Sequence, residues 1–98
     1  MNIVIVGAGK IGSALARYLV EEGHSITVVE RNPERVSRIS TSLDVMTVCA
    51  SADIDSLKLA GAEEADLLIA ATDSDESNIL CCLVARKLGA KNTVARVR

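Results

Sequence analysis

Three glycines near the start of the chain have the spacing of a phosphate-binding turn. They lie in the segment GAGKIG (residues 7–12), which matches G-x-G-x-x-G. In such a turn Gly7 allows the chain to leave a strand, Gly9 lets a pyrophosphate approach the backbone, and Gly12 lets a helix pack on the strand. The N–H groups and the positive dipole end of that helix attract the phosphates. The pattern therefore predicts a nucleotide site.

An acidic residue at the right distance strengthens this prediction. Glu30 ends the segment SITVVE, 18 residues beyond Gly12. A carboxylate there accepts hydrogen bonds from both ribose hydroxyls and repels a 2′-phosphate, which favours NAD(H) or an adenine mononucleotide over NADP(H). Arg31 follows directly and weakens this exclusion, because an arginine is the residue that accommodates a 2′-phosphate.

Residues that could catalyse a reaction are few. His24 is the only histidine, and it lies in a predicted turn at the end of the sheet opposite the glycine turn. Three acidic residues follow a predicted strand: Asp73, Asp75 and Glu76. We interpret them first as negative charges that stabilise the N-terminus of a helix. Hydride transfer would need a substrate pocket and an acid or base near the cofactor. The chain thus has a cofactor half and no substrate half.

Alternating strands and helices must position these residues. Short runs of branched apolar residues indicate buried strands, whereas apolar residues three and four apart indicate helices. The predicted strands cover residues 2–6, 25–30, 44–49, 65–71 and 93–98. The predicted helices carry apolar stripes within residues 11–19, 36–43, 55–60 and 80–88.

Local signals mark several helix ends and the faces that should be buried. Asn32 and Pro33 begin the second helix, Thr72 or Asp73 is expected to cap the last one, and Gly89 should end it. The residues expected to face the core in the first helix are Ile11, Ala14, Leu15, Tyr18 and Leu19. In the last helix they are Leu80, Leu83, Val84 and Leu88.

This order predicts one α/β domain over residues 1–98, a doubly wound Rossmann-like parallel sheet with helices on both faces. Its five strands should have the order 3-2-1-4-5, and ligands should bind at the carboxyl ends of the strands, where the order reverses.

Composition excludes several other classes. Apolar residues make up 49% of the chain and the net charge is −2, so there is no basic surface for a nucleic-acid backbone. Tyr18 is the only aromatic residue, which also argues against base stacking. The longest apolar run, residues 79–85, is far shorter than the ~20 residues of a membrane-spanning helix.

The N-terminus and the cysteines indicate a reducing cytoplasm. No basic lead-in precedes the apolar residues 3–6, so we expect no signal peptide. Cys49, Cys81 and Cys82 fit neither a disulfide framework nor a zinc pattern. We expect all three to be small buried apolar residues.

Several segments together resemble one known family. GAGKIG, Glu30, AGAEEAD (residues 60–66), IAATDSDESN (residues 69–78) and VARVR (residues 94–98) are similar to the N-terminal nucleotide-binding domain of Trk/Ktr-type potassium-uptake regulators, called TrkA-N, KTN or RCK-N. The resemblance covers essentially the whole chain. One segment departs from it, because residues 49–53 read CASAD where the family usually has a stretch like GDATD.

The resemblance implies a cytoplasmic subunit, peripheral to the cell membrane, that binds NAD(H) or ATP/ADP without turnover. It implies a dimer or higher oligomer that controls a membrane potassium transporter or channel. It also implies that the glycine turn holds the phosphates, that Glu30 holds the ribose, and that Arg96 reaches the phosphate side. Together with the residues derived above, the expected nucleotide-binding residues are Gly7, Ala8, Gly9, Lys10, Ile11, Gly12, Glu30, Arg31, Ser51, Ala52, Thr72, Asp73 and Arg96.

Two other functions stay open at this point. The chain could be the cofactor-binding half of an NAD-dependent oxidoreductase without its catalytic part, or a Rossmann-like interaction domain that binds no nucleotide. Related domains carry a further helix and strand, so we expect the sheet to be cut short after the fifth strand.

Overall fold

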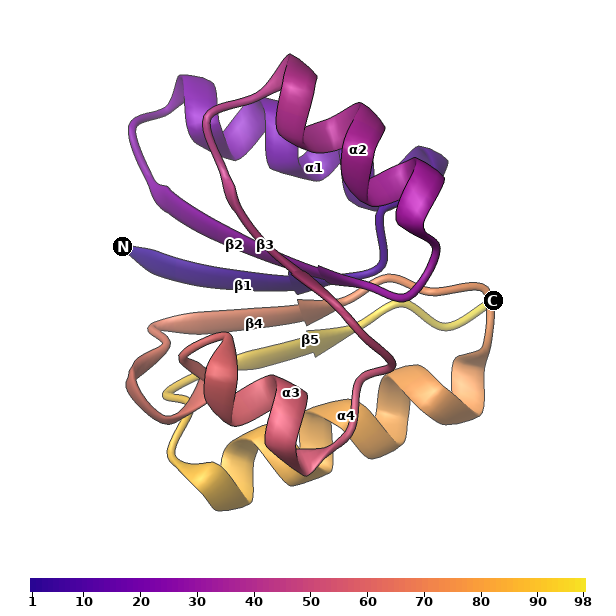
Figure 1. Ribbon diagram of the computed structural model, residues 1–98. Helices are drawn as coiled ribbons and strands as arrows, with labels where there is room; N and C mark the ends of the chain where they lie inside the picture. The colour runs from indigo at the N-terminus through magenta and orange to yellow at the C-terminus, as the bar shows by residue number, and fades with distance from the viewer.

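Five parallel strands form the centre of the structure, a computed structural model that describes residues 1–98 (Figure 1). The strands are β1 (Asn2–Val6), β2 (Ser25–Glu30), β3 (Met46–Cys49), β4 (Leu67–Ala70) and β5 (Thr93–Ala95). Their order is β3-β2-β1-β4-β5, and every neighbouring pair is parallel. The predicted fold class and strand order are confirmed. The prediction of a strand up to residue 98 was wrong, because β5 ends at Ala95.

Helices cover both faces of this sheet. They are α1 (Lys10–Glu21), α2 (Pro33–Ser42), α3 (Ile54–Leu59) and α4 (Asp75–Leu88), with a short 3-10 helix at Ala62–Glu64. The pair α1 and α2 lies on one face, and α3 and α4 lie on the other (Figure 1). None of these helices has both the length and the apolar character needed to cross a membrane.

The core consists of two aliphatic layers, one on each face of the sheet. In β1, Ile3 and Ile5 pack toward α1 and α2, whereas Val4 and Val6 pack toward α3 and α4. All four side chains are buried, as the alternation of side chains along a strand predicts for a sheet covered on both faces.

The buried faces of two helices differ from the predicted stripes. In α1 the buried residues are Gly12 and Ala16, while Ile11 and Tyr18 are 43% and 62% exposed. Small residues face the sheet because they let the helix approach it closely. Leu15 and Leu19 of the predicted stripe are half-buried and pack against the core as expected.

In α4 the shift is larger. Its fully buried residues are Asn78, Cys81, Cys82 and Ala85. Leu80 and Leu83, expected in the core, are instead 63% and 58% exposed. Val84 and Leu88, from the same predicted stripe, are partly buried and pack against the core as expected.

The predicted N-cap of α4 and the predicted burial of one cysteine need correction. The N-cap of α4 is Ser74, whose hydroxyl accepts a hydrogen bond from the N–H of Ser77, so neither Thr72 nor Asp73 is the cap. Cys81 and Cys82 are buried as predicted, but Cys49 is exposed. Cys49 ends β3, which is an edge strand with only one neighbour, and an edge position leaves one side uncovered.

Candidate functional site

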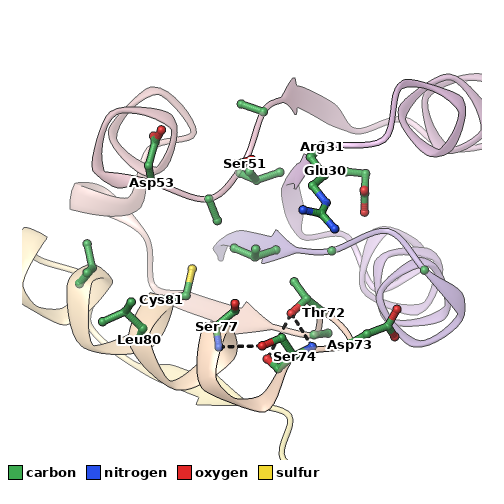
Figure 2. A pocket seen from close by; sticks show the side chains of 18 of the residues that line it. Glu30, Arg31, Ser51, Asp53, Thr72, Asp73, Ser74, Ser77, Leu80 and Cys81 are labelled. Atoms are coloured by element: carbon green, nitrogen blue, oxygen red, sulfur yellow. Dashed lines mark hydrogen bonds between the residues drawn. The ribbon is translucent and has the colours of Figure 1, made fainter.

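A cavity of about 720 Å³ opens at the carboxyl ends of the strands, between the two helical layers (Figure 2). Its volume lies within the range of small-molecule and cofactor pockets. The loops after β1, β2, β3 and β4 all contribute to its wall. The predicted residues that line it are Gly7, Gly9, Glu30, Arg31, Ser51, Ala52, Thr72 and Asp73.

Gly7 makes the sharp exit from β1 into this cavity. Its φ of +103° is a conformation that other residues rarely adopt, and an added Cβ would lie 2.9 Å from the carbonyl oxygen of Ala71. Its N–H donates to the carbonyl oxygen of Val29 at 2.8 Å, which ties the turn to β2. This position therefore requires glycine for the fold itself.

Gly9 and Gly12 differ in what surrounds them. A Cβ at Gly12 would lie 1.9 Å from the carbonyl oxygen of Gly7, so this glycine permits α1 to pack against the turn. At Gly9 the nearest atom would be a guanidinium nitrogen of Arg35 at 3.6 Å, and no backbone blocks the approach. Gly9 is the N-cap of α1, whose first-turn N–H groups have no acceptor within the helix. Gly9 thus leaves open the space that a phosphate would need.

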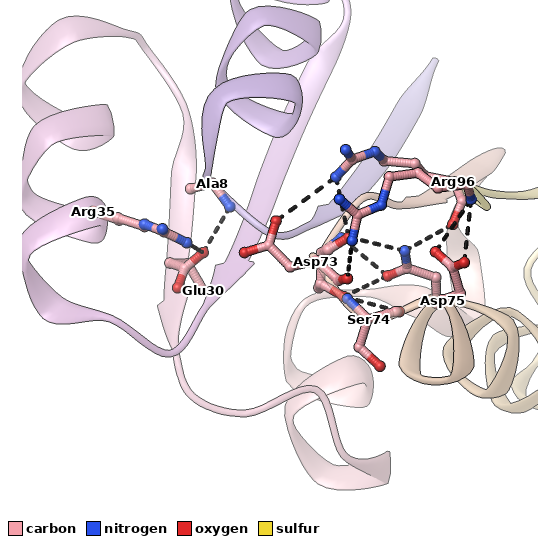
Figure 3. A network of polar contacts seen from close by, with 10 residues as sticks. Ala8, Glu30, Arg35, Asp73, Ser74, Asp75 and Arg96 are labelled. Carbon is pink, nitrogen blue, oxygen red and sulfur yellow. Dashed lines mark hydrogen bonds and ion pairs between the residues drawn. The ribbon is translucent and has the colours of Figure 1, made fainter.

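Glu30 joins the glycine turn to the loop after β2. Its side chain is 6% exposed, and its two carboxylate oxygens accept hydrogen bonds from the N–H groups of Ala8 at 2.7 Å and Asn32 at 2.9 Å. A guanidinium nitrogen of Arg35 lies 4.0 Å from the first oxygen (Figure 3). A carboxylate oxygen can accept more than one hydrogen bond, so Glu30 keeps acceptor capacity on the cavity side.

The loop after β4 is held by a buried amide. Asn78 is fully buried, and its Oδ1 accepts hydrogen bonds from the N–H of Thr72 at 3.0 Å and from its hydroxyl at 2.6 Å. Its Nδ2 donates to the carbonyl oxygens of Thr72 at 3.1 Å and Arg96 at 2.9 Å. Asn78 therefore links the β4–α4 loop, which lines the cavity, to the segment that follows β5.

Two arginines near the end of the chain contact the acidic residues that follow β4. The Arg96 guanidinium lies 3.8 Å from the Asp73 carboxylate and donates to the carbonyl oxygen of Thr72 at 3.3 Å (Figure 3). Arg98 donates to the carbonyl oxygen of Asp73 at 2.8 Å, and its N–H donates to the Asp75 carboxylate at 3.2 Å. Asp75 belongs to the first turn of α4, as predicted, whereas Asp73 lies outside the helix.

The loop after β3 closes the remaining side of the cavity. Asp53 caps α3, because its carboxylate accepts from the N–H of Ser56 at 2.8 Å while the Ser56 hydroxyl accepts from the N–H of Asp53 at 2.9 Å. These hydrogen bonds lower the pKa of Asp53 below its ordinary value. The Ser56 hydroxyl also donates to the carbonyl oxygen of Ser51 at 2.6 Å, which fixes the backbone at this predicted nucleotide-binding residue.

Some predicted residues do not line the cavity, and several that line it were not predicted. Ala8, Lys10, Ile11, Gly12 and Arg96 do not belong to the wall. Ala8 acts through its N–H on Glu30, and Gly12 lies beneath the turn. The unpredicted wall residues include Arg35, Asp53, Ile54, Ser77, Leu80 and Cys81. Only Asp53 had a local signal, as an acidic residue just before a short helix.

Cys81 supplies a thiol to the wall of this cavity. Burial raises its pKa to about 11, so the thiol is protonated at neutral pH. The thiolate is the nucleophilic form, and this environment disfavours it. His24 lies at the amino ends of the strands, where its Nδ1 is 3.1 Å from the N-terminal nitrogen, far along the sheet from the cavity.

The strand order, the glycine turn and the cavity at the carboxyl ends of the strands define a Rossmann-type nucleotide-binding domain. Residues 3–98 match the model of the TrkA-N domain, and the chain belongs to this family.

Curated relatives agree with this assignment. The chain is 43% identical over 100 residues to the Trk system potassium uptake protein TrkA of Halomonas elongata, covering 100% of this chain and 22% of that protein. It is 35% identical over 98 residues to a TrkA homolog of Methanothermobacter thermautotrophicus, covering 99% of this chain and 45% of the relative. The chain thus spans less than half the length of these relatives.

Among solved structures, the Shewanella denitrificans Kef CTD in its AMP-bound form superposes with a TM-score of 0.78 at 23% identity. The match covers 96% of this chain and 56% of that one, and at this identity it shows the fold alone.

Proposed function

We propose that this chain is a nucleotide-sensing regulatory domain of a potassium-uptake system. It binds NAD(H), or an adenine mononucleotide such as ATP or ADP, in the cavity at the carboxyl ends of the strands. One observation carries this proposal: the open backbone at Gly9 and the carboxylate of Glu30 lie in the wall of the same cavity of about 720 Å³. These two features match the phosphate and ribose of one adenosine-containing ligand.

Each residue has a separate role in the proposed complex. The first-turn N–H groups of α1 bind the phosphates, and Glu30 accepts hydrogen bonds from the ribose hydroxyls. Ser51 and Ala52 line the adenine side, while Thr72 and Asp73 lie along the ligand from the β4 rim. Arg96 offsets the charge of Asp73, which would otherwise repel a phosphate group.

The proposed role is regulation rather than turnover. The relatives bear the names of potassium-uptake proteins, and the only thiol in the cavity wall is held protonated. A ligand changes the activity of a partner when it binds two assembly states with different affinities. We propose that the domain works in this way as a self-associating cytoplasmic subunit on a membrane potassium transporter or channel.

Calorimetry and thermal shift with NAD, NADH, NADPH, ATP, ADP and AMP test the ligand proposal. A ligand at 100 times its Kd stabilises the folded state by about 2.7 kcal/mol, which corresponds to roughly 10 °C or more in Tm for a domain of this size. No stabilisation by any nucleotide, in protein shown to be free of bound ligand, contradicts the proposal. Tight binding of NADPH alone favours the oxidoreductase alternative.

Glu30→Gln tests the ribose contact, with Glu21→Gln as the matched control on an exposed face of α1. Loss of charge-assisted hydrogen bonds to the ribose should weaken nucleotide binding about 10- to 100-fold in Glu30→Gln. The control should bind as the wild type does. Equal affinities for all three proteins mean that Glu30 does not contact the ligand.

Potassium uptake in cells tests the regulatory proposal. Deletion of the gene for this chain should change the initial rate of potassium uptake, and the wild-type gene should restore it. The Glu30→Gln gene should restore it less well than the Glu21→Gln gene. Uptake that is unaffected by the deletion contradicts the regulatory role, even if the domain binds nucleotide.

A further inference from the structure

A second, smaller hollow lies between α1 and α2, behind the glycine turn. Its volume is about 150 Å³, and three arginines line it: Arg17 from α1, and Arg35 and Arg38 from α2. The hydroxyls of Ser13 and Ser42 also lie in its wall. We call it the arginine cleft. It is several times smaller than the nucleotide cavity.

The charge of the arginine cleft is not balanced by the protein. No carboxylate lies within 4.0 Å of the guanidinium groups of Arg17 or Arg38. The guanidinium of Arg35 lies 4.0 Å from the carboxylate of the buried Glu30. None of the residues that line the cleft is acidic. Three cations around one hollow repel one another, and an anion placed between them would remove this repulsion.

The donors that remain free in the cleft are those of the guanidinium groups. The Ser13 hydroxyl donates to the carbonyl oxygen of Ala8 at 2.9 Å, and the Ser42 hydroxyl donates to that of Arg38 at 2.7 Å. Guanidinium groups bind phosphate oxygens through paired N–H donors, and the two serine oxygens can accept a hydrogen bond from a protonated phosphate. The hollow has room for one such group and not for a whole nucleotide.

We propose that the arginine cleft is a second anion site, which takes a single phosphate group. The site adjoins the nucleotide cavity through Arg35, which belongs to the wall of both. The guanidinium nitrogen of Arg35 that lies 4.0 Å from Glu30 is also the atom nearest to the position that a Cβ on Gly9 would take. The phosphate can come from two sources. One is a free or separately carried phosphate, and the other is the 2′-phosphate of a nucleotide whose ribose lies at Glu30, where the cations of the cleft would offset the repulsion by the carboxylate.

The first arm of the test titrates inorganic phosphate into the 15N-labelled chain at an ionic strength held constant with chloride. NMR follows the amides of Ala8 and Ser13 and the side-chain Nε–H groups of the arginines. Saturable shifts at these positions are expected. Shifts that grow without saturation, or that spread evenly over all surface cations, overturn the proposal.

Charge-matched variants separate this site from general attraction. The pair Arg17→Gln and Arg38→Gln removes two cleft cations, neither of which lines the nucleotide cavity. The control pair Arg86→Gln and Lys87→Gln removes the same charge from the last turn of α4. Phosphate affinity should fall at least tenfold in the cleft variant and less than twofold in the control. Equal losses in both overturn the proposal.

The second arm compares the Kd values of NADPH and NADH. If the cleft variant raises the ratio of these values at least tenfold, the ribose phosphate occupies the site. If the ratio stays constant while binding of inorganic phosphate is lost, the occupant is a separate phosphate. If neither measurement changes, the site does not exist. The inorganic phosphate arm needs no nucleotide, so it decides on the cleft even if the proposed nucleotide function fails.

Discussion

Alanine substitutions at Gly12 and Gly9 should separate the folding role of the glycine turn from its binding role. The two residues are three positions apart in one turn, and the substitution adds the same methyl group to each. At Gly12 the new Cβ meets two backbone atoms of Gly7, at 1.9 Å and 2.8 Å. At Gly9 the nearest neighbour is the flexible end of Arg35 at 3.6 Å.

The magnitude for Gly12→Ala follows from this overlap. No change of side-chain rotamer can relieve a clash with backbone, so α1 must move away from β1. Overpacking of this kind costs about 1–3 kcal/mol or more, and the higher helix propensity of alanine returns only about 1 kcal/mol. The overlap is with backbone, so the cost lies at the upper end of this range, and we expect a net loss of about 2 kcal/mol, or roughly 10 °C in Tm, from a total stability of about 5–15 kcal/mol.

Gly9→Ala should leave the fold nearly unchanged. The φ and ψ of Gly9 are −76° and −159°, which alanine adopts without strain. Alanine is a poorer N-cap than glycine, but it also lowers the entropy of the unfolded chain by a similar amount, so the stability should stay within about 0.5 kcal/mol. The new methyl group fills the space of the pyrophosphate, and nucleotide affinity should fall about tenfold or more.

Urea unfolding followed by circular dichroism gives the stabilities, and calorimetry gives the affinities. A Gly12→Ala protein as stable as the wild type refutes the packing argument. A Gly9→Ala protein that loses as much stability as Gly12→Ala shows that Gly9 serves the fold. Unchanged nucleotide affinity in a folded Gly9→Ala protein places the ligand away from this turn.

Three further predictions concern buried and exposed polar groups. Asn78→Ala should lower the free energy of unfolding by about 3 kcal/mol in urea denaturation, because several backbone groups lose their buried partner; a loss below about 1 kcal/mol contradicts this. A thiol-reactive reagent at pH 8 should modify the exposed Cys49 quickly and Cys82, which is buried away from the cavity, only upon unfolding. Cys81 lines the cavity but should react slowly, because burial raises the pKa of its thiol to about 11. Fast modification of all three thiols would refute this. Hydrogen bonds from the N–H of Asn2 and then from Lys91 lower the pKa of Asp66. The carboxylate of Asp66 therefore stabilises the fold at pH values above its ordinary pKa near 3.8, and this stabilisation is lost as the pH falls below that value. Asp66→Asn should flatten the dependence of the free energy of unfolding on pH in this range, and an unchanged slope would contradict this role of Asp66.

The strand order and the glycine turn could be predicted from the sequence because their signals are local. A run of branched residues, the glycine turn that follows it and an acidic residue at the end of the second strand can be recognised without knowledge of distant partners. The same holds for Asn32, which accepts a hydrogen bond from the N–H of Glu34 and begins α2 as expected.

The buried face of α4 could not be predicted, because two adjacent stripes satisfy the same periodicity. The larger side chains Leu80 and Leu83 mark one stripe, and the smaller Cys81 and Ala85 mark the other. Close packing on the sheet selects the smaller set, together with the amide of Asn78, and this choice depends on the shape of the opposite surface. Hydrophobicity alone therefore places Leu80 and Leu83 in the core wrongly, although it places Val84 and Leu88 there correctly.

The contacts of Arg35 could not be predicted from the sequence pattern either. An arginine in the first turn of a helix is an ordinary surface residue unless α1 lies next to α2 and the buried carboxylate of Glu30 lies at the end of β2 beside it. This arrangement depends on three elements that meet only in the folded sheet. The same three elements place one guanidinium in the walls of two cavities.

Two buried polar side chains hold the loops that surround the cavity. Glu30 bonds the loop after β1 to the loop after β2, through Ala8 and Asn32. Asn78 bonds the loop after β4 to the segment after β5. A ligand that binds loops already held in place loses less conformational entropy than one that must order them. Loss of the Asn78 amide should therefore weaken nucleotide binding although Asn78 does not line the cavity.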